Sequence, residues 1–169
     1  VRVFGTFAVF LLVSGLAVQI IAGQLPNPDA AKPGMKRVNR ANASCATIPS
    51  LRPVGALPKA TVLTFVDLGP RLITITHHDA IAGPYHRNGE AIIDIQKAFR
   101  GTADDARAVA RKHGATLLLI CPNMSESTIY KSQAPSGFYM QLIGGTVPAW
   151  LEPVSLPATS PFKLWRIRS

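Results

Sequence analysis

Residues 89–120, GEAIIDIQKAFRGTADDARAVARKHGATLLLI, decide the fold class of this chain. The first half carries Ile92, Ile95 and Phe99 at i, i+3 and i+7, with charged residues between them. Such spacing places three apolar side chains on one face of a helix. We therefore expect a helix that packs this face against a core and ends at Gly101.

The second half predicts another helix and then a buried strand. Thr102 has the position of an N-cap, acidic residues follow it, and basic residues precede Gly114. These charges match the helix dipole, and a glycine just past the last turn is a usual end of a helix. Residues 115–120, ATLLLI, are continuously apolar, as in strands that are covered on both faces.

Patterns of strands and short helices continue on both sides of this region. The predicted strands are residues 60–66, 71–76, 150–156 and 162–168. Residues 125–133 predict a short helix capped by Ser125, and residues 137–144 fit either a helix or a strand. A strand, two helices and a strand in succession imply a crossover that places the two strands in parallel in one sheet. The sequence predicts an α/β fold, a small sandwich with a mixed sheet.

The N-terminal part of the chain has a different character. Residues 3–23 are uncharged, and a helix of this length spans about 31 Å, the thickness of the hydrocarbon core of a membrane. We expect a transmembrane helix, with a cleaved signal peptide as the alternative. Residues 24–58 are basic and rich in proline and predict a linker, and residues 59–169 predict the folded domain. The start at Val1 without methionine suggests the C-terminal piece of a longer membrane protein.

The composition limits the classes of protein and partner. The chain has 169 residues, of which 47% are hydrophobic and 16% charged, and this excludes a disordered protein. Its net charge of +9 favours an anionic partner. The basic residues are scattered without aromatic residues between them, so we expect no nucleic acid. Motifs of phosphate-binding loops and of known nucleophile turns are missing from the sequence, and we assign no catalytic residue.

Two features disagree about the side of the membrane on which the domain lies. Cys45 precedes the folded region and Cys121 ends a predicted strand, which suits one disulfide and hence an oxidising compartment. Two buried free thiols are the alternative. The cations that follow the apolar run outnumber Arg2 before it, which favours a cytoplasmic domain; they are Lys32, Lys36, Arg37 and Arg40. We favour the extracytoplasmic side.

The densest polar cluster is residues 77–88, HHDAIAGPYHRN, between a predicted strand and a predicted helix. In open α/β sheets, ligands bind beyond the carboxyl ends of strands. The N-terminus of the following helix offers N–H groups to an anion, and an arginine can add a bidentate contact. The predicted contacts to a phosphate, a sugar phosphate or a carboxylate are His78, Tyr85, His86, Arg87 and Asn88.

Two other interpretations of this cluster remain open. A metal site would use His77 or His78 with Asp79 and His86, but their spacing matches no standard zinc pattern, and we expect neither a metal nor a cofactor. The third interpretation is structural and is the favoured one. In it, Asn88 caps the helix and the loop is held by its own hydrogen bonds.

Several of these features occur in an order that resembles a known group of proteins. They are the final apolar segment, Cys45, the segment DLGP at 67–70, the cluster at 77–88, Cys121-Pro122 and the segment GGTVPAWL at 144–151. The order resembles the C-terminal extracytoplasmic region of bacterial polytopic membrane proteins that are grouped with the GT-C class glycosyltransferases, the mannosyl- and aminoarabinosyl-transferase-like superfamily.

The resemblance implies a periplasmic domain at the inner membrane, next to upstream transmembrane helices of the same protein and to membrane lipid. A polyprenyl-phosphate sugar is the usual donor in this class, and the catalytic acid lies in a loop that has no counterpart here. The resemblance therefore implies that the domain assists binding of a lipid-linked sugar donor or acceptor and that this chain alone is inactive. The alternative is a single-pass, membrane-anchored periplasmic protein that binds or scaffolds partners without catalysis.

Overall fold

The fold is built on a five-stranded sheet, within the residues 33–168 that the computed structural model describes. Its strands are β1 (Thr61–Leu63), β2 (Asp79–Ala80), β3 (Leu117–Ile120), β4 (Leu151–Pro153) and β5 (Lys163–Ile167). Their order is β2-β1-β3-β5-β4, with β1 parallel to β2 and β3, and β5 antiparallel to β3 and β4. The predicted α/β fold with a mixed sheet is confirmed.

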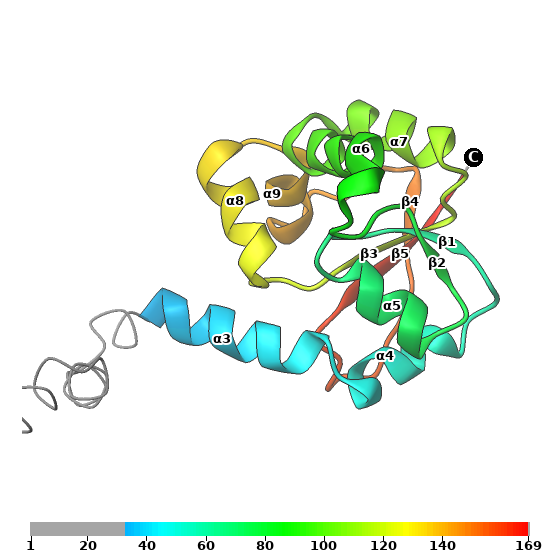
Figure 1. The fold of residues 1–169 in the computed structure, drawn as a ribbon. Helices are drawn as coiled ribbons and strands as arrows, with labels where there is room; N and C mark the ends of the chain where they lie inside the picture. Colours follow the sequence, from blue (N-terminus) through cyan, green and yellow to red (C-terminus); the bar gives the residue numbers. More distant parts are fainter. Residues whose placement is uncertain (1–32, 169) are drawn as a thin grey trace, which may run out of the picture. The chain divides into compact units, whose positions relative to one another are not determined.

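Helices cover both faces of this sheet (Figure 1). One face carries α4 (Ile48–Gly55) and α5 (Gly69–Ile75), and the other carries α6 (Gly89–Arg100), α7 (Ala103–Lys112), α8 (Ser125–Gln133) and α9 (Phe138–Ile143). The chain path explains this arrangement, because β2 and β3 lie on opposite sides of β1 and right-handed connections in opposite directions place their helices on opposite faces. The helix α3 (Pro33–Cys45) precedes α4, and the short 3₁₀ helix η1 (His86–Asn88) leads into α6.

An aromatic cluster fills the core beneath α6, α8 and α9. The ring of Phe65, in the loop after β1, lies 5.1 Å from that of Phe99 on α6, edge to face. The same ring lies 5.5 Å from Tyr130 and 5.7 Å from Tyr139. All four side chains are fully buried. Aromatic pairs at these distances add about 0.5–1.5 kcal/mol each beyond the burial of their area, so this cluster fixes the loop after β1 against the helices.

The two helices predicted from residues 89–120 are both present. In α6, Ile95 and Phe99 are fully buried, as the spacing predicted. In α7, the Thr102 hydroxyl accepts from the Asp105 N–H while the Asp105 carboxylate accepts from the Thr102 N–H, which is a capping box. Gly114, beyond the end of α7, has φ of 62°, a conformation that glycine adopts without strain.

The strand predicted at residues 71–76 is wrong, because this segment is the helix α5. Pro70 lies in its first turn, where a missing N–H costs nothing and the fixed φ suits a helix. Leu72 points into the core, whereas Ile73 is 45% exposed. The same residues also fit a helix, because Leu72 and Ile75 are three positions apart and lie on one face of α5. The second strand is instead β2, on the segment with the histidines.

The predicted linker is helical in the part that the structure describes. Both α3 and α4 fall within residues 24–58. The Thr47 hydroxyl accepts from the Ser50 N–H and caps α4, and Leu51 and Val54 of α4 are fully buried in the core. The prolines of this segment favoured the prediction of a linker. Pro49, however, lies in the first turn of α4, where proline is tolerated.

Three smaller predictions have outcomes as well. The predicted helix at 125–133 is α8, but Ser125 does not cap it, because Met124 has the N-cap position and Ser125 is the first residue of the helix, with its N–H donating to Asn42 Oδ1 over 2.9 Å. The ambiguous segment 137–144 contains the helix α9. Within residues 33–168 no helix is long and apolar enough to cross a membrane. The transmembrane helix predicted at residues 3–23 lies outside the described residues.

Candidate functional site

The histidine cluster at residues 77–88 is divided between the interior and the surface. His78 is only 2% exposed. Its Nδ1 accepts from the Ala60 N–H over 3.1 Å, and its Nε2 lies 2.9 Å from the Val54 carbonyl oxygen. A carbonyl oxygen only accepts, so Nε2 carries the proton and both ring nitrogens are used. His78 joins α4 to the start of β1, so both of its ring nitrogens have internal partners and neither is available to the anion that the sequence predicted for it.

The other four predicted contacts lie at the surface, around η1. Tyr85 is 54% exposed, and His86 and Arg87 are exposed as well. Asn88 has the N-cap position of α6, but its side chain makes no capping hydrogen bond. Among the described residues, none of these four side chains takes part in a hydrogen bond. The structural interpretation required that Asn88 caps α6 and that side chains of the loop form hydrogen bonds within it. The structure shows neither of these for the four residues.

Arg87 and Asn88 line a surface pocket of about 370 Å³, which we call the α6–α7 pocket. It lies between the start of α6 and the end of α7. The other polar residues that line it are Glu90, Asp94, Lys112 and His113. The pocket thus combines guanidinium, ammonium and imidazole groups with two carboxylates and an amide.

Asp94 is the centre of the hydrogen bonds in this pocket. Its Oδ2 lies 2.7 Å from Lys112 Nζ and 2.7 Å from His113 Nε2. These two hydrogen bonds lower the pKa of Asp94, and the hydrogen bond that Lys112 donates to Asp94 raises the pKa of Lys112. Asp94 is therefore a carboxylate at neutral pH, and it holds the Lys112 and His113 side chains at the edge of the pocket.

The sequence prediction missed Asp94, Lys112 and His113. A signal for them existed, because α6 and α7 are joined by only two residues, Gly101 and Thr102. Consecutive helices with so short a connection lie side by side in opposite directions, which brings the first turns of one helix near the last turn of the other. Lys112 and His113 could thus have been placed beside the start of α6.

A second polar centre lies beyond the carboxyl ends of β1 and β3. The Glu126 carboxylate, on α8, is 5% exposed and accepts from the backbone N–H groups of Val66 and Asp67 over 3.0 and 2.8 Å. It also accepts from the Tyr130 hydroxyl. Burial raises the pKa of Glu126, against the effect of these three hydrogen bonds. The carboxylate is enclosed by the protein, and its hydrogen bonds hold the loop after β1 in place.

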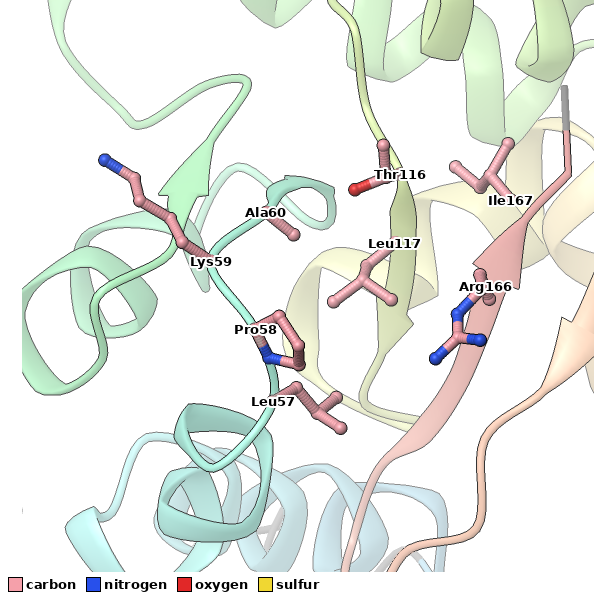
Figure 2. Close-up of a pocket in the computed structure, with 8 residues that line it drawn as sticks. All are labelled: Leu57, Pro58, Lys59, Ala60, Thr116, Leu117, Arg166 and Ile167. Atoms are coloured by element: carbon pink, nitrogen blue, oxygen red, sulfur yellow. The ribbon is translucent and has the colours of Figure 1, made fainter.

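A third feature is a largely apolar groove of about 360 Å³ at the amino ends of β1 and β3 (Figure 2). Figure 2 shows Leu57 and Pro58 on one side of Leu117 and the Arg166 side chain on the other. Lys59 points away from the groove, and its Nζ pairs with Asp79 Oδ2 at 3.2 Å. Arg166 thus places a positive charge beside a largely apolar surface. Such a surface suits a peptide segment that carries apolar side chains and one acidic side chain.

The predicted disulfide between Cys45 and Cys121 is present. It joins the end of α3 to the end of β3, with a Cα–Cα distance of 6.3 Å and a sequence separation of 76. A bridge over so long a segment restricts the unfolded chain strongly, by about 4 kcal/mol in the chain-entropy model. A buried disulfide of this kind belongs to an oxidising compartment.

The fold is similar to that of a solved domain. The crystal structure of the C-terminal globular domain of an oligosaccharyltransferase from Archaeoglobus fulgidus aligns with a TM-score of 0.50. The alignment covers 81% of this chain and 98% of that domain, at 10% sequence identity. No protein-family model and no curated protein matches the sequence. The comparison thus shows a likeness of fold between this chain and the C-terminal domain of that oligosaccharyltransferase.

Proposed function

We propose that this chain contains the last transmembrane helix and the extracytoplasmic C-terminal domain of a membrane glycosyltransferase of the GT-C class. In this proposal the domain assists binding of a lipid-linked sugar donor or acceptor, and other transmembrane helices of the same protein hold the catalytic residues. The observation that carries the proposal is the likeness of nearly the whole domain to the C-terminal domain of an oligosaccharyltransferase.

Two features of this chain support the proposed location. The uncharged residues 3–23 have the length of a membrane-spanning helix. The disulfide between Cys45 and Cys121 fits a domain on the oxidising side of the membrane. In this proposal the protein lies in the inner membrane and its domain lies in the periplasm. The partners of the domain are membrane lipid and the upstream transmembrane helices of the same protein.

The α6–α7 pocket is the proposed binding site for the sugar phosphate of a polyprenyl-phosphate sugar. The Arg87 guanidinium can hold a phosphate by two parallel hydrogen bonds, and Lys112 adds a further positive charge. The Asn88 amide and the Glu90 carboxylate can exchange hydrogen bonds with sugar hydroxyls. Tyr85 and His86, exposed on the same loop, are the proposed outer contacts.

The test is binding of mannose 1-phosphate to the full chain in neutral detergent, measured by calorimetry. We expect binding by the wild type and at least a tenfold loss in the double variant Arg87→Gln/Lys112→Gln. The control variant, Arg52→Gln/Arg71→Gln, loses the same charge at exposed positions of α4 and α5 and should bind like the wild type. Equal affinity in the two double variants would place the binding elsewhere and remove the α6–α7 pocket from the proposal.

A second candidate is a membrane-anchored periplasmic protein that binds or scaffolds a partner without catalysis. The apolar groove beside Leu57 and Leu117 favours it, because such a surface suits a peptide segment better than a sugar (Figure 2). This candidate requires that the wild type does not bind mannose 1-phosphate. It also requires that a photo-crosslinker at Leu57 captures one partner protein, and that Arg166→Gln, at an exposed position of the same groove, weakens the crosslink.

A further inference from the structure

A second pocket in the described part of the chain has a lining without acidic residues. It has a volume of about 290 Å³ and lies between α3 and the loop after β3. Arg37, Arg40 and Ser44 of α3 line one side, and Pro122 and Asn123 line the other. The disulfide between Cys45 and Cys121 lies at the same pocket and fixes its two sides to each other. We call it the α3 pocket.

The arginines lie on one face of α3. Residues three and four apart are neighbours on a helix surface, so Arg37, Arg40, Ala41 and Ser44 form one strip. Both arginines are exposed, whereas Ala41 beneath them is buried. Two guanidinium groups one turn apart, with no carboxylate in the pocket lining, form a site for a group with several anionic oxygens.

The opposite side of the α3 pocket adds a donor and a further positive charge. Asn123 Oδ1 accepts from Lys131 Nζ over 2.9 Å, which fixes the orientation of the amide and leaves its NH2 group as a donor. Asn123 has φ of 67°, an uncommon value for a residue other than glycine, and this hydrogen bond holds its side chain in place. Lys131 thus places a third cation next to the pocket.

We propose that the α3 pocket binds the phosphate of an anionic phospholipid head group. Only 13 residues, 24–36, separate Arg37 from the apolar segment 3–23, and even a fully extended chain of this length reaches no more than about 45 Å. With residues 3–23 in a membrane, the pocket stays within reach of the lipid surface. The proposal rests on the proposed membrane-spanning segment at residues 3–23 and does not depend on the assignment of the α6–α7 pocket.

The experiment is a titration of the full, isotope-labelled chain in neutral detergent micelles, followed by NMR. The reporters are the backbone amides of Ser44 and Asn123, on the two sides of the pocket. The probes are dihexanoyl phosphatidylglycerol, dihexanoyl phosphatidylcholine and inorganic phosphate. We expect saturable shifts of both amides with phosphatidylglycerol and much weaker shifts with the other two probes.

The variant Arg37→Gln/Arg40→Gln should weaken the response to phosphatidylglycerol roughly 30-fold, since each cation near an anionic lipid surface contributes about fivefold. The variant Arg52→Gln/Arg71→Gln should respond like the wild type. Equal affinity for inorganic phosphate would show a site for free phosphate and overturn the lipid assignment. Shifts with phosphatidylglycerol that survive Arg37→Gln/Arg40→Gln, or no shifts at all, would overturn the α3 pocket as a site.

Discussion

Replacement of Glu126 should destabilise the domain because three hydrogen-bond donors of the protein depend on its carboxylate. Its carboxylate is the only acceptor found for the Val66 N–H, the Asp67 N–H and the Tyr130 hydroxyl within the described residues. In Glu126→Ala, the Val66 N–H and the Tyr130 hydroxyl stay buried without an acceptor, whereas Asp67 is exposed and its N–H can reach water. A buried group without a partner costs about 1–3 kcal/mol, so two cost roughly 2–6 kcal/mol.

Glu126→Gln keeps the shape of the side chain. It therefore separates the loss of stability that comes from the hydrogen bonds from the loss that comes from the missing side-chain volume. One amide oxygen remains as an acceptor, while the new NH2 group faces a former donor, so we expect a loss of about 1–3 kcal/mol. The matched control is Glu152→Gln, at an exposed strand position where the carboxylate pairs with Arg168 at 3.2 Å. An exposed ion pair contributes about 0–1 kcal/mol.

Urea unfolding of the full chain in neutral detergent measures these losses. The two tryptophans of the sequence, Trp150 and Trp165, both lie buried in the domain, so their fluorescence reports on the domain alone. A lower midpoint at unchanged slope is a loss of stability. If Glu126→Gln and Glu152→Gln lower the midpoint equally, the three hydrogen bonds to Glu126 do not stabilise the loop after β1, and the argument is refuted.

The pH dependence of Glu126 has a definite sign. Burial raises its pKa in the folded state above the ordinary 4.5, so the folded state takes up this proton more readily than the unfolded state. The contribution of this proton to stability is complete below about pH 4.5 and is lost as the pH rises through the folded pKa. The free energy of unfolding of the wild type relative to Glu126→Gln should therefore be larger at pH 4 than at pH 7.

Three further predictions use the same unfolding assay. His78→Ala should lose about 2–4 kcal/mol because the Ala60 N–H and the Val54 carbonyl lose their partner, whereas the exposed His77→Ala should lose less than about 1 kcal/mol. Cys45→Ala/Cys121→Ala should lose roughly 4 kcal/mol, and dithiothreitol should then destabilise the wild type but not this variant. Thr102→Ala should lose about 1 kcal/mol through the capping box of α7, while Thr74→Ala, exposed on α5, should change little. A wild-type midpoint in any of the first-named variants would show that the contact in question is not a stabilising one.

Those helices and strands whose sequence patterns lie entirely within their own segment were predicted correctly. The helices α6 and α7 combine apolar spacing, a cap and charges that agree, and a prediction from such consistent local signals is reliable. The segment 71–76 had only an alternation over six residues, and the proline that begins α5 lies just outside it. The helix α4 was missed because its burial depends on contacts with α5 and with His78, which come later in the chain.

The candidate site shows the same limit. Arg87 and Asn88 were found because a polar loop before a helix is a local pattern, and the prediction that they bind an anion is still to be tested. Asp94, Lys112 and His113 join them only through the antiparallel packing of α6 on α7. Those three residues look like ordinary charges on a solvated helix face when each helix is considered separately.

The division of the histidine cluster decides how binding experiments on this domain should be interpreted. Loss of His78 removes internal hydrogen bonds between α4 and the start of β1, so a His78 variant could lower the binding of any ligand by destabilising the domain. Loss of Arg87 removes an exposed side chain with no hydrogen bond to the described residues, so its effect on binding is separable from stability. A fall in sugar-phosphate affinity at an unchanged urea midpoint therefore identifies a contact to the ligand, and within residues 77–88 only the exposed residues can produce that result.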